Sequence, residues 1–266
     1  MSSIGMVLAD SSVIAKRNII KIKRIPDLLV GTLISPIMFI LLFAYVFGGS
    51  IAVPGVDYKE FLVPGIFAQT VIFGATITGS GLADDMQKGI IDRFRSLPMA
   101  QSAVLVGRTA SDVITNVLVV IIMVSTGLVV GWRIRTSFLD AAVGFVLLLL
   151  FAYAVSWIMA LLGLIVRTPE AFNNLTFITI FPITFVADTF APTQNFPAVL
   201  RTIAEWNPVS SLVRAAREQF GNLPAGYPAG SWPLQNPVLY TLIWVAVILL
   251  VFVPLATRQY KRAAAR

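Results

Sequence analysis

The sequence predicts an all-α integral membrane protein with six transmembrane helices, and three observations support this class. Hydrophobic residues make up 57% of the 266 residues and charged residues only 12%, whereas soluble domains carry about 25% charged residues. Apolar runs close to the roughly 20 residues that cross a bilayer recur along the chain. Polar segments rich in basic residues, glycine and proline separate these runs. We therefore expect one membrane domain over residues 1–266.

Residues 1–27 precede the first span and are too polar to cross a membrane. Apolar residues recur at helical spacing from Ile4 to Arg24, with Ile14 and Ile19 at the edges of the apolar face. We expect an amphipathic helix in the membrane interface, with its cations near anionic headgroups. Those cations are Lys16, Arg17, Lys21, Lys23 and Arg24. Because the basic residues follow the apolar ones, the segment does not fit a cleavable signal peptide.

Six apolar segments have the composition of membrane spans. They are expected at Leu28–Phe47, Phe61–Leu82, Thr109–Val130, Phe138–Val166, Asn174–Ala187 and Val238–Ala256. Pro36 should kink the first span, and Pro182 interrupts the short fifth span. The second span is rich in Gly, Ser and Thr, which allow helix backbones to approach closely. We expect it to face other protein, with a pore-lining role as the alternative.

The placement of basic residues predicts the orientation of these spans. With the amino terminus inside, 14 of the 20 Lys and Arg residues fall in inner segments and 6 in outer ones, as the positive-inside rule requires. Both termini are then cytoplasmic. The same bias explains the net charge of +7, so we expect a lipid bilayer as partner and no nucleic acid.

The residue types present exclude several chemistries. The chain has no cysteine and no histidine, which excludes a disulfide framework, a thiolate metal site and the commonest general base. It contains no G-x-x-x-x-G-K-[ST] sequence to cradle nucleotide phosphates. Acidic residues such as Asp112, expected in the first turns of the third span, lie near span ends rather than at the bilayer centre, where ion-coupled transporters place them. We expect no catalytic residue, cofactor or metal.

Two polar segments between spans attract functional interest. Residues 84–108 form the longest polar interruption in the first two thirds of the chain, and Met86–Leu97 has helical spacing that Pro98 ends. This helix is either a solvated connector or a lever that a soluble partner moves, and the pattern alone does not decide between them. Residues 188–236 mix amphipathic pieces with prolines. We expect short helices there that dip into the outer leaflet or lie on it.

Three motifs in these segments resemble one family. The run Lys88–Pro98, reading KGIIDRFRSLP, is followed by Gly107-Arg108, and Arg24-Ile25-Pro26 precedes the first span. The third motif comprises Phe190-Ala191-Pro192, Phe196-Pro197 and Trp206-Asn207-Pro208, which lead to Arg214 and Arg217. In this order they resemble the ABC-2 type transporter permeases, and among them the daunorubicin-resistance (DrrB-like) drug-exporter group. The resemblance covers nearly the whole chain. It departs at Gln87-Lys88, where many relatives carry an acidic residue before the loop glycine.

The resemblance implies a permease subunit that exports an amphiphilic drug or lipid-like substrate. ATP would be hydrolysed on a separate ABC ATPase, a dimer, and the permease would pair with a second copy or a related permease. The coupling helix in the ATPase groove would comprise Lys88, Gly89, Ile90, Asp92, Arg93, Phe94, Arg95, Leu97 and Pro98. The outer gate would include Pro192, Pro197, Asn207 and Pro208. On the residues alone, an ion-coupled secondary transporter and a non-transporting membrane scaffold are the alternatives.

Overall fold

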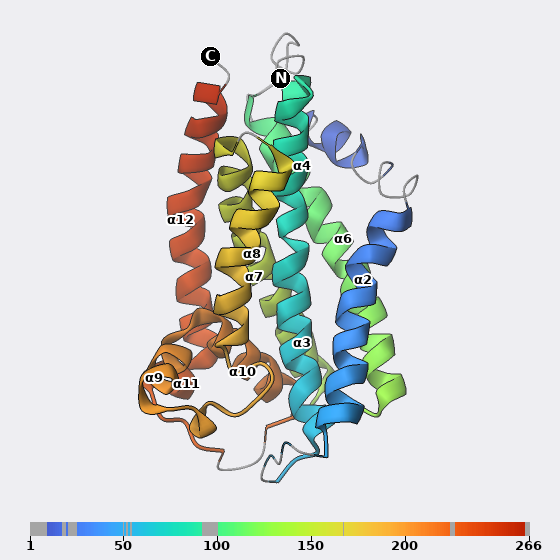
Figure 1. Cartoon of the computed structure of the whole chain (residues 1–266), viewed down its shortest axis with the longest axis vertical. Helices are drawn as coiled ribbons and strands as arrows, with labels where there is room; N and C mark the ends of the chain where they lie inside the picture. Colours follow the sequence, from blue (N-terminus) through green and yellow to red (C-terminus); the bar gives the residue numbers. More distant parts are fainter. Residues whose placement is uncertain are drawn as a thin grey trace.

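The computed structural model describes residues 10–17, 20, 26–49, 51, 53, 55–91, 101–166, 168–223 and 227–263. All regular structure in these ranges is helical, and the long helices run side by side along one axis (Figure 1). They are α2 (Pro26–Leu41), α3 (Tyr58–Gly74), α4 (Thr76–Gln87), α6 (Gln101–Val130), α7 (Phe138–Ile165), α8 (Pro169–Phe185) and α12 (Pro237–Ala263).

Short helices gather at one end of this bundle. They are η2 (Thr193–Asn195), α9 (Ala198–Trp206), α10 (Pro208–Phe220) and α11 (Trp232–Gln235). The helical residues 10–17 and the last turns of α12 lie at the opposite end (Figure 1). We call this the terminal end, and the end with α9–α11 the far end.

Among the residues that the structure describes, four helical stretches are long and apolar enough to cross a membrane. They are Tyr58–Gln87, Ala103–Val130, Phe138–Ile165 and Pro237–Arg262, which correspond to the second, third, fourth and sixth expected spans. The first expected span forms α2 and its π-helical continuation η1 (Leu42–Phe47). The fifth forms α8, which has 17 residues and begins five residues before the expected start. An all-helical membrane fold is thus confirmed, and the count of six spans stays a prediction.

The start of the third span differs from the expectation. Helix α6 begins at Gln101, eight residues before the expected Thr109, because no proline interrupts the helix between them. Asp112 therefore lies about 16 Å along the helix, at 1.5 Å per residue, and not in its first turns. This depth matters for the chemistry of the α4–α6 contact described below.

Helices α3 and α4 lie at the centre of the bundle, and only Ala75 separates them. Every residue of α3 except Lys59 and Phe73 is buried. A Cβ added to Gly163 of α7 would overlap the carbonyl oxygen of Gly79 in α4, so the two backbones touch. The expectation that the small residues of the second span face protein is confirmed.

We predict that Gly163→Ala destabilises the bundle by about 1–3 kcal/mol, the usual cost of overpacking a filled interior. The added methyl group meets backbone at Gly79, which cannot move aside as a flexible side chain can. Thermal unfolding in detergent measures the effect. Gly49→Ala is the matched control, because a Cβ there has no neighbour within 4 Å. Equal melting temperatures for the two variants would contradict the close crossing.

Candidate functional site

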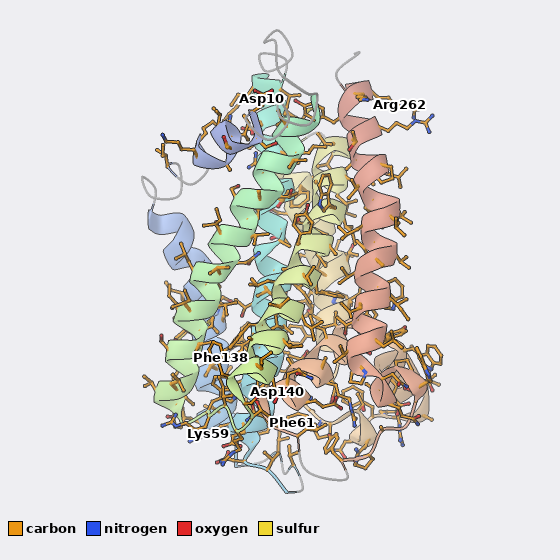
Figure 2. All side chains as sticks on the ribbon, turned by 180° about the vertical axis from the view of Figure 1, so that it is seen from behind. Asp10, Lys59, Phe61, Phe138, Asp140 and Arg262 are labelled. Carbon is orange, nitrogen blue, oxygen red and sulfur yellow. The ribbon has the colours of Figure 1, made fainter. Side chains whose placement is uncertain are left out.

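Charged side chains collect at the two ends of the bundle. Asp10 and Arg262 mark the terminal end, while Lys59 and Asp140 mark the far end (Figure 2). Each end contains a buried ionic contact between segments that are distant in sequence, and these two contacts are the candidate sites. In the part of the chain that the structure describes, no cluster of three or more acidic residues could hold a metal ion.

At the terminal end, one carboxylate binds two guanidinium groups. Asp85 of α4 accepts a hydrogen bond of 2.7 Å from Arg108 Nη1 of α6 and one of 3.2 Å from Arg17 Nη2. The side chains of Asp85 and Arg108 are 4% and 9% exposed, and that of Arg17 is 38% exposed. We call these three residues the Asp85 junction. It ties the helical residues 10–17 to both α4 and α6.

Two glycines make room for the junction. The guanidinium of Arg108 lies against Gly81, where any Cβ would overlap Nη2. Gly107 lies directly under the backbone of Ser11 and the side chain of Ile14. Ile14 was expected at the edge of the apolar face, yet it is only 3% exposed and faces α6. The expected interfacial helix is thus attached to the bundle through packing as well as charge.

We call residues 84–108 the coupling loop, after the role that the resemblance implies. It begins with a break in the helix rather than with a continuous helix from Met86, and helical structure resumes at Ile90 and Ile91. Helix α4 continues to Gln87, and Gly89 follows in the left-handed region at φ +63°. This conformation ends a helix and favours glycine, since a Cβ would be strained there. The carboxylate of Asp84 lies 2.8 Å from Lys88 Nζ and raises the pKa of that exposed amine.

Beyond the break, Ile91 anchors the loop to the bundle. It is 2% exposed and packs in an apolar cluster with Leu82, Leu105 and Tyr260. Ile90, which the sequence indicated as an apolar contact for a partner, is half-buried. Sequence reasoning did not single out Ile91, although it lies beside Ile90 at the start of the loop.

Several expected site residues lie outside the described residues. In the coupling loop these are Asp92, Arg93, Phe94, Arg95, Leu97 and Pro98, and in the interfacial helix they are Lys21, Lys23 and Arg24. Lys16 is described and is exposed.

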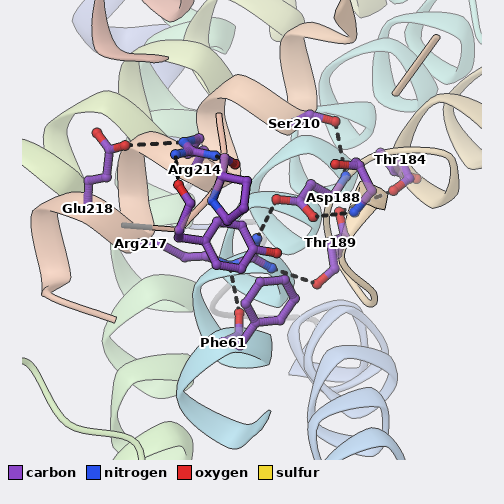
Figure 3. A network of polar contacts seen from close by, with 11 residues as sticks. Phe61, Thr184, Asp188, Thr189, Ser210, Arg214, Arg217 and Glu218 are labelled. Carbon is purple, nitrogen blue, oxygen red and sulfur yellow. Dashed lines mark hydrogen bonds and ion pairs between the residues drawn. The ribbon is translucent and has the colours of Figure 1, made fainter. Parts of the chain in front are cut away.

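At the far end, Arg217 of α10 and Asp188 form a fully buried ion pair (Figure 3). Their side chains are 0% and 2% exposed, and Arg217 Nη1 lies 2.8 Å from Asp188 Oδ2. Arg217 also donates to the backbone oxygens of Phe61 and Thr189 at 2.8 and 3.2 Å, and it stacks over the Phe61 ring. Burial raises the pKa of the Asp188 carboxyl, and the neighbouring Arg217 opposes this rise.

The four expected gate residues lie between Asp188 and Arg217 in the sequence. Asn207 joins α9 to α10: its side-chain oxygen accepts from the Val209 amide at 2.9 Å, and its side-chain nitrogen donates to the Ile183 carbonyl of α8 at 2.7 Å. Pro208 is the first residue of α10, a position that needs no amide hydrogen. Pro192 is buried before η2, and Pro197 is exposed before α9. Of these four residues, only Asn207 bridges separate helices through side-chain hydrogen bonds.

Additional contacts fasten the far end. Glu60 at the start of α3 accepts hydrogen bonds of 2.6 and 2.8 Å from Arg135, in the connection between α6 and α7. The hydroxyl of Tyr58 donates to the Phe190 carbonyl at 2.9 Å. Together with the Asp188–Arg217 pair, these contacts join α3 to α10, to the connection between α6 and α7, and to the segment that follows α8.

Comparison with known proteins identifies the family. The family model described as ABC-2 type transporter matches residues 11–220. This chain belongs to the ABC-2 type transporter family. The sequence resemblance is therefore confirmed over a range that contains both the Asp85 junction and the Asp188–Arg217 pair.

Relatives of this ABC-2 chain are named as permeases. The daunorubicin resistance ABC transporter permease protein DrrB1 of Streptomyces coeruleorubidus is 32% identical over 245 residues, covering 92% of this chain and 83% of that protein. The doxorubicin resistance ABC transporter permease protein DrrB of Mycobacterium tuberculosis (strain ATCC 25618 / H37Rv) is 29% identical over 237 residues, covering 84% and 82%. The putative transport permease ycf38 of Cyanophora paradoxa is 23% identical over 209 residues, covering 77% and 72%.

The relatives and the fold agree on the broad class of this ABC-2 protein. Its relatives are permeases of ABC transporters, several of them named for drug resistance, and such permeases are not themselves enzymes. The four apolar helices in its described part that are long enough to cross a membrane make it a multi-pass membrane protein.

We predict that Arg217→Met destabilises the folded chain by about 3–5 kcal/mol, because it leaves the Asp188 carboxylate buried without its partner. The double variant Arg217→Met/Asp188→Asn should lose less than Arg217→Met alone. Unfolding in detergent with increasing denaturant measures both.

Arg201→Met is the control for this prediction. Arg201 pairs with Glu205 on one helix and is 42% exposed, so its loss should cost at most about 1 kcal/mol. Similar losses for the two arginines would contradict the assignment of the buried pair as the main ionic contact of the far end.

Proposed function

We propose that this chain is the transmembrane permease subunit of an ABC exporter in the bacterial cytoplasmic membrane. It moves an amphiphilic, drug-like or lipid-like substrate outward with ATP hydrolysed on a separate ATPase subunit. The observation that carries the proposal is the position of the family's loop motif, Lys88–Pro98: its first residues, Lys88 to Ile91, directly adjoin the Asp85 junction. A movement imposed on the loop therefore reaches three segments of the bundle at once.

The terminal end faces the cytoplasm in this proposal. The bias of Lys and Arg supports that orientation, and both α2 and α8 run lengthwise between the two ends (Figure 1). Together α2 and η1 have 16 and 6 residues, a length of about 33 Å at 1.5 Å per residue. The 17 residues of α8 reach about 25 Å, which a locally thinned bilayer accommodates. These two helices complete six spans.

The segment that contacts the ATPase comprises Lys88, Gly89, Ile90, Asp92, Arg93, Phe94, Arg95, Leu97 and Pro98, with Lys88 and Gly89 in the turn that precedes the coupling helix. It lies in a groove of the ATPase dimer, with the interfacial helix beside the same ATPase. Gly89 supports this role because its left-handed conformation separates the loop from α4 and lets it turn. Ile91 supports it because its burial links the loop rigidly to α6 and α12.

The far end forms the outer gate. Pro192, Pro197, Asn207 and Pro208 delimit the short helices there, and the Asp188–Arg217 pair fixes α10 against α3. Two permease copies, or this chain and a related one, pair in the membrane and enclose the substrate path. Exposed apolar side chains on α2, α6, α8 and α12 provide surface for lipid and for such pairing.

Two other functions have distinct signatures. An ion-coupled transporter would export substrate in vesicles with a proton gradient and no ATPase. A scaffold would hold the ATPase in a stable complex and export nothing.

We predict that Leu97→Ala lowers ATP-driven export about tenfold while the complex still assembles and hydrolyses ATP. The loss corresponds to about 1.4 kcal/mol, within the value of burying one leucine side chain in a partner groove. Vesicles that contain the purified chain and its ATPase provide the assay. The control is Leu200→Ala on α9, which is 44% exposed at the far end. Full export by Leu97→Ala, or by a variant with a scrambled loop, would contradict coupling through the loop.

We predict opposite labelling at the two ends of the bundle. The chain has no cysteine, so single cysteines can be placed without a background. An impermeant maleimide should label Phe138→Cys and Val199→Cys in intact cells, since both positions are more than 70% exposed at the far end. It should label Val13→Cys and Lys88→Cys only after permeabilisation. Labelling of Val199→Cys and Val13→Cys from the same side would contradict six spans.

A further inference from the structure

The charges beside the junction are distributed unevenly. Among the described side chains of this region, Asp85 binds both Arg17 and Arg108. Asp112 of α6 is 7% exposed, and its buried Oδ2 has no hydrogen-bond partner. Two guanidinium groups thus bind one carboxylate, while the buried Oδ2 of the second carboxylate accepts no hydrogen bond from either of them. Taking a carboxylate out of water without a partner costs several kcal/mol. A second arrangement that pairs Asp112 would recover part of this free energy.

Arg108 is placed to reach either acid. It lies four residues before Asp112 on α6, and residues at this spacing occupy the same helix face with Cβ atoms about 5–6 Å apart. Its present partner Asp85 is on a different helix, α4. A change of side-chain rotamer with a small shift of α4 along α6 would therefore bring the guanidinium from one carboxylate to the other.

Asp85 would not be left without a cation by this change. Arg17 already lies 3.2 Å from Asp85 Oδ2 and stays on it when Arg108 leaves. In the second arrangement each carboxylate holds one guanidinium. The two arrangements contain the same charges, so neither needs an ion from outside, and their free energies can lie close together.

The contact between α4 and α6 also contains unsatisfied polar groups. Gly81 faces Arg108 and Gly74 faces Asn116, and the two helices run in opposite directions (Figure 1). Thr78 lies between these glycines, at the level of Asp112, and its buried hydroxyl has no hydrogen-bond partner. Leaving a buried polar group without a partner costs free energy, so a relative position of the two helices that gives Asp112 or Thr78 a partner would be favoured.

We propose that Asp112 is the second acceptor of Arg108 in the transport cycle. Arg108 moves from Asp85 to Asp112 as the coupling loop is displaced, and α4 is released from α6 while Arg17 keeps the interfacial helix on α4. Asp112 is then a positioning residue: it acts through Arg108 and touches no substrate. This inference rests on the proposed function, because ATP-driven displacement of the loop supplies the force.

Two variants should shift the position of Arg108, between Asp85 and Asp112, in opposite directions. Asp112→Asn removes the charge of the second acceptor and should hold Arg108 on Asp85. Gly81→Ala places a methyl group where Arg108 Nη2 now lies and should drive Arg108 toward Asp112. Asp140→Asn is the control for loss of a carboxylate, because Asp140 lies in the exposed first turn of α7.

The experiment measures the distance between α4 and α6 in the complex with its ATPase. Spin labels at Gln87→Cys and Ile114→Cys report it, and both positions are exposed. Without nucleotide the parent chain should show one distance, and trapped ATP should add a second. Asp112→Asn should keep only the first and lose about tenfold or more in export. Gly81→Ala should show the second without nucleotide.

The outcomes of this experiment separate the proposed role of Asp112 from the proposed function as an exporter. If ATP drives export by the parent chain but Asp112→Asn exports equally and shows both distances, the inference is overturned and the proposed function stands. If Gly81→Ala keeps the single parent distance, the inference is overturned without reference to transport. If the parent chain exports nothing with ATP, the proposed function fails, and the Gly81→Ala distance still reports whether Arg108 has a second position.

Discussion

The carboxylate of Asp85 is the contact on which the rest of this structure depends. It joins a helix that lies across the end of the bundle to two helices that run through it, because Arg17 and Arg108 both bind it. The contact is nearly free of water at Asp85 and Arg108, so removing one partner would leave a buried charge. It also lies three residues before Lys88, the first residue of the family's loop motif. A displacement of the loop therefore cannot leave the junction unchanged.

The two ends of the bundle differ in how their buried acidic side chains are paired. At the far end, Arg217 uses its guanidinium on Asp188, Phe61 and Thr189, which holds α3 and α10 in one position. At the terminal end, the α4–α6 contact leaves Asp112 and Thr78 without partners. A buried acid that is ion-paired at the far end, and one without a hydrogen bond at its buried oxygen in the α4–α6 contact, suit a bundle that moves where the loop is displaced. The close α4–α7 crossing at Gly79 and Gly163 lies between the two ends.

The sequence predicts the helical membrane class and the protein-facing second span because both depend on local composition. It does not predict the pairing of Asp85, since Arg17 and Arg108 lie 68 and 23 residues away along the chain. Arg217 was counted among outer cations, and only the packing of α10 on α3 shows that it is buried. The start of the helix expected from Met86 was wrong, because apolar spacing does not reveal the left-handed turn at Gly89; Ile90 and Ile91 are helical, and the rest of that helix stays a prediction. Asp112 was placed too near the helix start because helix ends are weakly encoded.

The most direct test of this account is a double-mutant cycle on the substrate exported per ATP hydrolysed. The parent chain, Asp85→Asn, Arg108→Met and the double variant would be compared in vesicles with the ATPase. If the junction transmits the motion as one unit, each single variant lowers the ratio strongly and the double variant lowers it little further, which is the signature of coupled residues. Losses that simply add, or single variants with an unchanged ratio, would contradict the central role of the Asp85 junction.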